Sequence, residues 1–131
     1  QLEYMKAEAI IDSNLPHQAR NQENELGKFN MEYELIRKDL DKVIEIAPDY
    51  VYAYYNRGYV LSQLKDYRGA LADYDKAISL YPNFAEAYFN RGLIHIFIGD
   101  NNKGVSDLSK AGELGIASAY NIIKRFSLVQ N

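Results

Sequence analysis

The 131-residue chain has 47% hydrophobic residues, no cysteine and a formal net charge of −3 at pH 7. Without cysteine it cannot form a disulfide framework or a thiolate zinc site, and no apolar run reaches the ~18 residues of a membrane span. We therefore expect one compact, water-soluble domain without a transmembrane segment, and the cellular compartment stays open.

The first fifty residues carry the least regular pattern of the chain. Gln1 to Ile11 is predicted to be helical, and Asp12 to Pro16 breaks that helix. Met31 to Ala47 has a clear apolar stripe, and we expect the polar segment His17 to Asn30 to supply its partner helix. Because the sequence begins at Gln1 rather than at methionine, we expect a fragment or a processed end of a longer protein.

An internal repeat follows. The segment Val51 to Phe84 returns in recognisable form from Ala85 to Ser118, and we call the step from Val51 to Ala85 the repeat period. The matching pairs of identical residues are Ala53 and Ala87, Tyr54 and Tyr88, Asn56 and Asn90, Arg57 and Arg91, Gly58 and Gly92, Asp66 and Asp100, Asp73 and Asp107, Lys76 and Lys110, Ala77 and Ala111, and Leu80 and Leu114. A fixed period of this kind indicates a repeat array whose units bury apolar faces against their neighbours.

Each copy is predicted to be two packed helices, with turns near Lys65-Asp66, Asn83 and Gly99-Asp100. Gly58 and Gly92 lie inside the apolar stripe of the first helix, which predicts close approach of the second helix, because an interior glycine otherwise costs roughly 1 kcal/mol. Asp66 and Asp100 are placed to cap that second helix. Pro82 ends the unit, and Pro48, one repeat period earlier, indicates a preceding unit of the same kind.

The chain is predicted to end in one more helix. Gly112 and Gly115 interrupt the pattern, and Ser118 to Val129 then forms an amphipathic segment. A repeat array usually closes with an atypical helix, because the inner face of the last repeat would otherwise meet water. We therefore interpret this segment as a capping helix.

These residues resemble the tetratricopeptide repeat family. The resemblance rests on Ala53 to Gly58, on Lys65-Asp66-Tyr67 with Ala70, and on Tyr74, Ala77 and Pro82. The second copy departs from the family at Gly104, Leu108 and Ile116. The resemblance implies an all-α fold, an α–α superhelix (solenoid) of about three helix-turn-helix repeats. One domain then spans residues 1–131: degenerate helices and a first repeat at 1–50, repeats at 51–84 and 85–118, and the cap at 119–131.

The resemblance also implies a binding surface. First helices of successive tetratricopeptide repeats line a concave groove, which in this chain would expose the following residues: Tyr52, Tyr55, Asn56, Tyr59, Glu86, Phe89, Asn90 and Leu93. Tyrosines there offer apolar area together with a hydroxyl group, at a low entropy cost. Tyr54 and Tyr88 are expected to pack in the core, and core packing is also the competing interpretation for Tyr55 and Phe89.

The sequence offers little for catalysis or for binding nucleic acid. His17 and His95 fall in different units without an orienting partner, so we expect His95 to be a packing residue. Asp73 and Asp75 diverge on a helix and make poor joint metal ligands. Residues 1–50 carry six Lys/Arg against eleven Asp/Glu, a net of −5, and residues 51–131 carry a net of +2. Neither half has the basic surface that phosphates require.

Our interpretation is a non-enzymatic scaffold, without a cofactor or metal, that binds a peptide or protein segment in the groove. The alternative is a structural or self-assembly module whose groove is filled by its own Gln1 to Ile11 helix or by another copy. Some tetratricopeptide co-chaperones grip acidic C-terminal peptides with a lysine, asparagine and arginine clamp. Asn56 matches that clamp, but Glu86 and Asn90 replace its lysine and arginine, and Arg57 and Arg91 should point elsewhere. We therefore expect a preference for apolar, aromatic or mildly basic partners.

Overall fold

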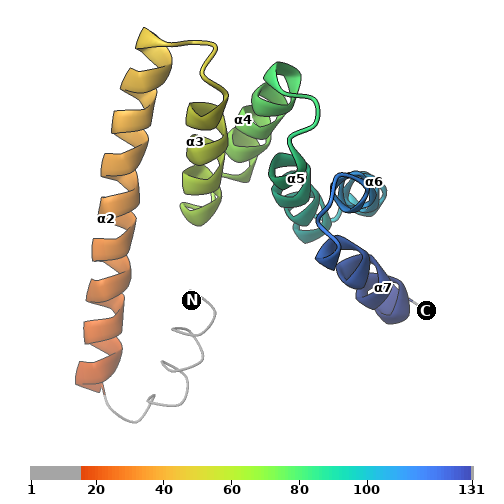
Figure 1. Ribbon diagram of the computed structural model, residues 1–131. Helices are drawn as coiled ribbons and strands as arrows, with labels where there is room; N and C mark the ends of the chain where they lie inside the picture. Colours follow the sequence, from red (N-terminus) through yellow and green to blue (C-terminus); the bar gives the residue numbers. More distant parts are fainter. Residues whose placement is uncertain (1–15, 131) are drawn as a thin grey trace.

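The computed structural model of the protein describes residues 16–130, which form six helices and no strand (Figure 1). The helices are α2 (Pro16–Ile46), α3 (Val51–Gln63), α4 (Tyr67–Leu80), α5 (Ala85–Phe97), α6 (Asn101–Glu113) and α7 (Ser118–Gln130). The helix expected at Gln1 to Ile11 lies outside the described residues. The arrangement confirms the predicted all-α helical-repeat solenoid.

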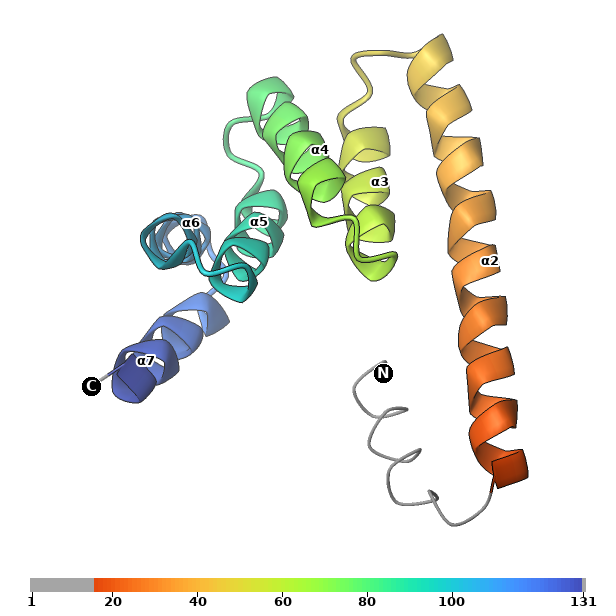
Figure 2. The same cartoon turned by 180° about the vertical axis from the view of Figure 1, so that it is seen from behind.

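The prediction of a helix pair before Val51 is wrong. One helix, α2, runs unbroken through His17 to Asn30 and on to Ile46, so the first segment is not a separate partner for the second. Gly27 is the only strong helix breaker inside this range and costs only about 1 kcal/mol relative to alanine. Arg37 adds local support, because it binds Glu34 at 2.7 Å and Asp41 at 3.0 Å, one turn away on either side. Figures 1 and 2 show α2 extending well beyond the end of α3.

The repeat unit is a helical hairpin, as predicted. α4 follows α3, and α6 follows α5, after turns at the expected positions. The turn after α3 has Lys65 at φ 65°, and the turn after α5 has Gly99 at φ 96° in the equivalent position of the next repeat. The Asp66 side chain accepts a hydrogen bond from the Gly69 amide at 3.0 Å, which confirms it as a helix cap. Asp100 makes no such side-chain bond, so its predicted capping role is wrong.

Close packing of the two helices explains the interior glycines. A Cβ atom added at Gly58 would lie 3.0 Å from the ring of Tyr74. One added at Gly92 would lie 3.0 Å from the Asp107 Cβ and 3.1 Å from the Gly104 carbonyl oxygen. Each helix pair is therefore in contact where its first helix has no side chain, as the glycine positions predicted.

Two apolar clusters hold the array together. The first is centred on the buried ring of Tyr74 and joins α3, α4 and α5 through residues that include Tyr54, Ala77 and Phe84. The second is centred on Leu108 and joins α5 and α6 to α7, where Ala119 is fully buried. Burial of apolar surface between successive units is what stabilises such an array, and it orients α3 and α5 side by side.

Candidate functional site

Five of the eight predicted groove residues are well exposed. On α3, Tyr52 and Tyr59 keep 50% and 45% of their surface exposed, and Asn56 is also exposed. On α5, Glu86 lies exposed in the first turn and Leu93 keeps 37% of its surface exposed. These side chains come from the first helices of two neighbouring repeats, the arrangement that a groove requires.

The other three predicted groove residues are partly buried. Tyr55 lies against the first apolar cluster, with its ring centre 4.7 Å from that of Phe84 and 5.8 Å from that of Tyr74. Its hydroxyl oxygen accepts a hydrogen bond from the Asn90 amide group at 3.1 Å. Burial raises the pKa of Tyr55, and the nearby carboxylate of Glu86 adds to that rise. The hydrogen bond between Tyr55 and Asn90 therefore links α3 of one repeat to α5 of the next.

Phe89 is the third partly buried residue. Its ring packs on the second apolar cluster, together with Tyr88. The core interpretation of Tyr55 and Phe89 is thus correct for a large part of each ring, while each keeps some exposed surface. Tyr54, at 8% exposure, is the packing residue that the sequence predicted.

The structure also contains two arginine–aspartate clusters that the sequence analysis did not assign. Arg57 binds both carboxylate oxygens of Asp73 at 2.7 and 2.8 Å and also binds Asp41 of α2 at 3.0 Å. Arg91 repeats the geometry in the next repeat, binding both oxygens of Asp107 at 2.8 Å and Asp75 at 3.0 Å. The signal was present in the sequence, because both the arginines and the aspartates recur with the period of the repeat.

Each arginine connects three helices. Arg57 lies on α3, Asp73 on α4 and Asp41 on the preceding helix α2, so one guanidinium group ties its own repeat to the one before. The hydrogen bonds that Arg57 donates to Asp73, and Arg91 to Asp107, raise the pKa values of the two arginines. Both arginines are directed at these carboxylates rather than along the predicted groove, as expected. Asp73 and Asp75 bind different arginines and so diverge as predicted.

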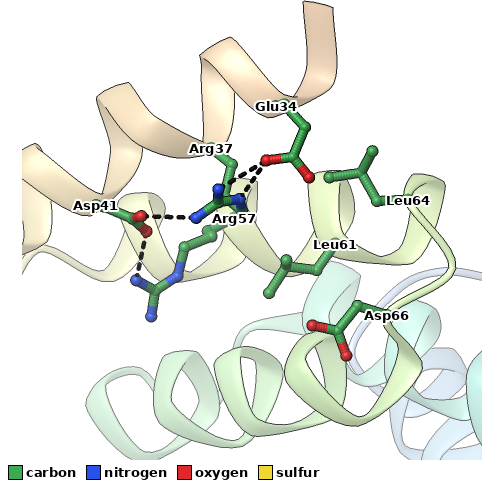
Figure 3. Close-up of a pocket in the computed structure, with 7 residues that line it drawn as sticks. All are labelled: Glu34, Arg37, Asp41, Arg57, Leu61, Leu64 and Asp66. Carbon is green, nitrogen blue, oxygen red and sulfur yellow. Dashed lines mark hydrogen bonds and ion pairs between the residues drawn. The ribbon is translucent and has the colours of Figure 1, made fainter. Parts of the chain in front are cut away.

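Shallow pockets lie beside both clusters. The pocket beside Arg57 has a volume of about 400 Å³ and includes Leu61 and Asp66 (Figure 3). The equivalent pocket beside Arg91 has a volume of about 700 Å³ and includes His95 and Asp100 at the matching positions. Figure 3 shows Arg37 between Glu34 and Asp41, with Arg57 directed at Asp41. Opposite charges already pair within these pockets, so we assign them a structural role.

His95 and the carboxylates do not form a metal site in the described part of the chain. The imidazole is mostly buried, with Nδ1 3.7 Å from Asp100 and Nε2 3.9 Å from Asp107, which fits the expected packing histidine. Between residues 16 and 130, no group of three or more His, Asp or Glu side chains is arranged to hold a metal ion. None of the helices in that range combines the length and the apolar character needed to cross a membrane.

Comparison with known proteins agrees with the geometry. Two family models described as tetratricopeptide repeat match residues 51–84 and 73–105. No curated protein matches the chain. The structure is similar to the first TPR of Spaghetti (RPAP3), solved bound to the HSP90 peptide SRMEEVD, with a TM-score of 0.71 and 20% identity over 82% of this chain and 88% of that chain.

Two further solved structures are similar at slightly higher identity. The complex of the TPR2B domain of yeast Sti1 with pHsp70 matches with a TM-score of 0.65 and 26% identity, over 82% of this chain and 90% of that chain. A MamA RS-1 double mutant matches with a TM-score of 0.61 and 27% identity, over 87% of this chain and 64% of that chain. The repeated hairpins, the family models and these structures agree, and the chain contains tetratricopeptide repeats within residues 51–105.

Proposed function

We propose that the chain is a protein-interaction scaffold that binds a peptide or protein segment along α3 and α5. The observation that carries the proposal is the exposed aromatic surface of α3, where Tyr52 and Tyr59 lie half exposed, together with Leu93 of α5, which is 37% exposed. Exposed tyrosines gathered on one surface are typical of recognition sites, because a tyrosine buries a large area and loses little entropy on binding. The proposal assigns no catalytic residue and no nucleic-acid partner.

Relatives of the fold support a peptide ligand. The Spaghetti structure holds an HSP90 peptide, and the yeast Sti1 structure is a complex with pHsp70. Both similarities extend over about four-fifths of this chain. We infer the same class of partner here, a short protein segment, with a different chemical preference that follows from Glu86.

The predicted anchors differ in how they can be tested. Tyr55 and Phe89 pack on the apolar clusters, so their truncation would change the fold and the binding together. Tyr52 and Tyr59 are half exposed and better isolate the binding surface. A suitable control is Tyr81, which has 45% exposure but lies in the turn after α4.

Panning a displayed peptide library on the purified protein would supply a ligand for this test. We expect enriched peptides with aromatic and basic residues, and at least about a thirtyfold loss of affinity in Tyr52→Ala/Tyr59→Ala, since groove anchors typically contribute about 2 kcal/mol. Tyr81→Ala should bind as the wild type does. Peptides that bind the double variant and the wild type equally would place the site elsewhere.

A further inference from the structure

The C-terminal half of α2 is equivalent to the second helix of a repeat. Asp41 of α2 binds Arg57 of α3 at 3.0 Å, just as Asp75 of α4 binds Arg91 of α5 at 3.0 Å. Asp41 and Asp75 are separated by one repeat period, as are the two arginines. α2 therefore packs on α3 in the way that α4 packs on α5.

This equivalence identifies one face of α2 that lacks its usual neighbour. In α4, the four residues that pack on the first helix of the same repeat are buried: Ala70, Asp73, Tyr74 and Ala77. Their counterparts in α2, which we call the open face of α2, are Ile36, Asp39, Leu40 and Val43. Ile36 is 45% exposed, Val43 is 37% exposed and Asp39 is exposed, because no other helix of the described range packs on this face.

The last described helix, α7, also has an exposed apolar face. Arg125 of α7 lies one repeat period after Arg91, so α7 is equivalent to the first helix of a repeat. The positions that α3 and α5 bury as Val60 and Ile94, at 4% and 7% exposure, correspond to Leu128. Leu128 is 69% exposed, and its neighbour Val129 is 80% exposed. We call Arg125, Leu128 and Val129 the open face of α7.

We propose that the open face of α7 binds the open face of α2 on a second copy of this chain, with Arg125 opposite Asp39. The contact would reproduce between two copies the helix pairing that α3 and α4, and α5 and α6, form within one copy. In those pairs the arginine binds an aspartate 16 residues later, and Asp39 occupies that aspartate's position in the repeat. No ion pair between described residues involves either Arg125 or Asp39.

Charge and shape agree with this end-to-end contact. α2 carries five Lys/Arg against seven Asp/Glu, a net charge of −2, and α7 carries Lys124 and Arg125 without an acidic residue, a net charge of +2, so the two helices attract each other. Phe126 of α7 occupies the position of Gly58 and Gly92 in the two repeats. Ile36 and Val43 of α2 likewise occupy positions where both repeats have alanine or glycine. The two helices would therefore pack at a wider separation, toward the upper part of the usual range of about 8 to 10 Å. α2 and α7 lie at opposite extremes of the described helices (Figures 1 and 2), so the contact is heterologous and adds copies in a row.

Sedimentation velocity of the 131-residue chain at increasing concentration tests the proposal. We expect the mean mass to rise with concentration and to fall in high salt, because exposed charges are screened. Arg125→Glu alone and Asp39→Arg alone should each weaken self-association about tenfold or more, since each places like charges at the contact. Both residues are exposed, so circular dichroism should show a wild-type fold.

A mixture of the two single variants provides the decisive comparison. The introduced glutamate of one variant then faces the introduced arginine of the other, while the remaining contacts pair the native Arg125 with the native Asp39. The mixture should therefore recover the self-association that each variant lacks. Lys124→Glu is the matched control, because it makes the same change in charge one residue away and should leave association intact. A chain that stays monomeric at all concentrations would overturn the proposal. So would oligomers that the two contact variants weaken no more than the control does, or a mixture that does not recover.

Discussion

Replacing Gly92 with alanine tests whether close approach of α5 and α6 explains the repeated glycine. The new Cβ atom would lie 3.0 Å from the Asp107 Cβ and 3.1 Å from both the Gly104 carbonyl oxygen and the Leu108 Cγ. Two of these atoms belong to buried side chains and one to the backbone, so α6 must shift as a unit. Overpacking of this kind costs about 1 to 3 kcal/mol, against a gain of about 1 kcal/mol in helix propensity.

Gly27→Ala is the matched control for this experiment. Gly27 also lies inside a helix, but nothing lies within 4 Å of an added Cβ atom. Both substitutions gain the same helix propensity, so the difference between their unfolding free energies isolates the packing penalty, about 1 to 3 kcal/mol. Urea denaturation followed by far-ultraviolet circular dichroism measures it. We expect Gly27→Ala to stabilise and Gly92→Ala not to; equal shifts in both variants would refute the close-approach explanation.

Two further substitutions test the ion pairs and the turn. Asp107→Ala should lower the unfolding free energy by about 2 to 4 kcal/mol, because it leaves the partly buried Arg91 without its paired hydrogen bonds. Asp75→Ala, which removes a largely exposed partner of the same arginine, should cost less than about 1 kcal/mol; a similar loss in both variants would contradict this ranking. Lys65→Gly should stabilise by about 1 kcal/mol, because Lys65 has the positive φ that Gly99 adopts in the next repeat. A thermal unfolding midpoint of Lys65→Gly below that of the wild type would contradict this expectation.

The repeat period predicted the fold because residues of several kinds, which favour helix packing, a turn and a helix end, recur at the same spacing. A glycine in the first helix, an aspartate at the turn and a proline after the second helix all recur, and each is consistent with the same hairpin. The structure places the turns where those residues stand. Local patterns that agree with one another are a stronger guide to structure than any one propensity.

The region before Val51 could not be predicted in the same way. Met31 to Ala47 keeps the pattern of a second helix, and this period led us to expect a first helix before it. The segment His17 to Asn30 lacks the paired glycine and tyrosine of the later repeats, having Asn24 and Arg20 at those positions. At the position of the Lys65-Asp66 turn the chain has Met31-Glu32, and without an aspartate cap there the uninterrupted helix α2 formed instead.

The candidate site was predicted only in part. The resemblance implied a set of groove residues, but how exposed each of them is depends on the residues that pack against it. Phe84, the last residue of the repeat 51–84, packs on the rings of both Tyr55 and Tyr52, yet Tyr52 stays 50% exposed. The arginines and the aspartates were visible in the sequence as repeated residues. In each pair, however, the arginine and the aspartate lie 16 residues apart and on different helices. A helix pattern alone does not show which charges on two helices will meet.

Binding of acidic peptides offers a test of ligand preference. Glu86 lies exposed in the first turn of α5, where the resemblance would place a clamp lysine. Arg57 and Arg91 are each held by two carboxylate groups, so neither can bind a ligand carboxylate without losing those bonds. A glutamate beside a bound carboxylate costs several kcal/mol at short range. We expect calorimetric titration with the peptide SRMEEVD to show no binding, and Glu86→Lys to bind measurably better. Micromolar binding to the wild type that weakens with added salt would refute the role assigned to Glu86.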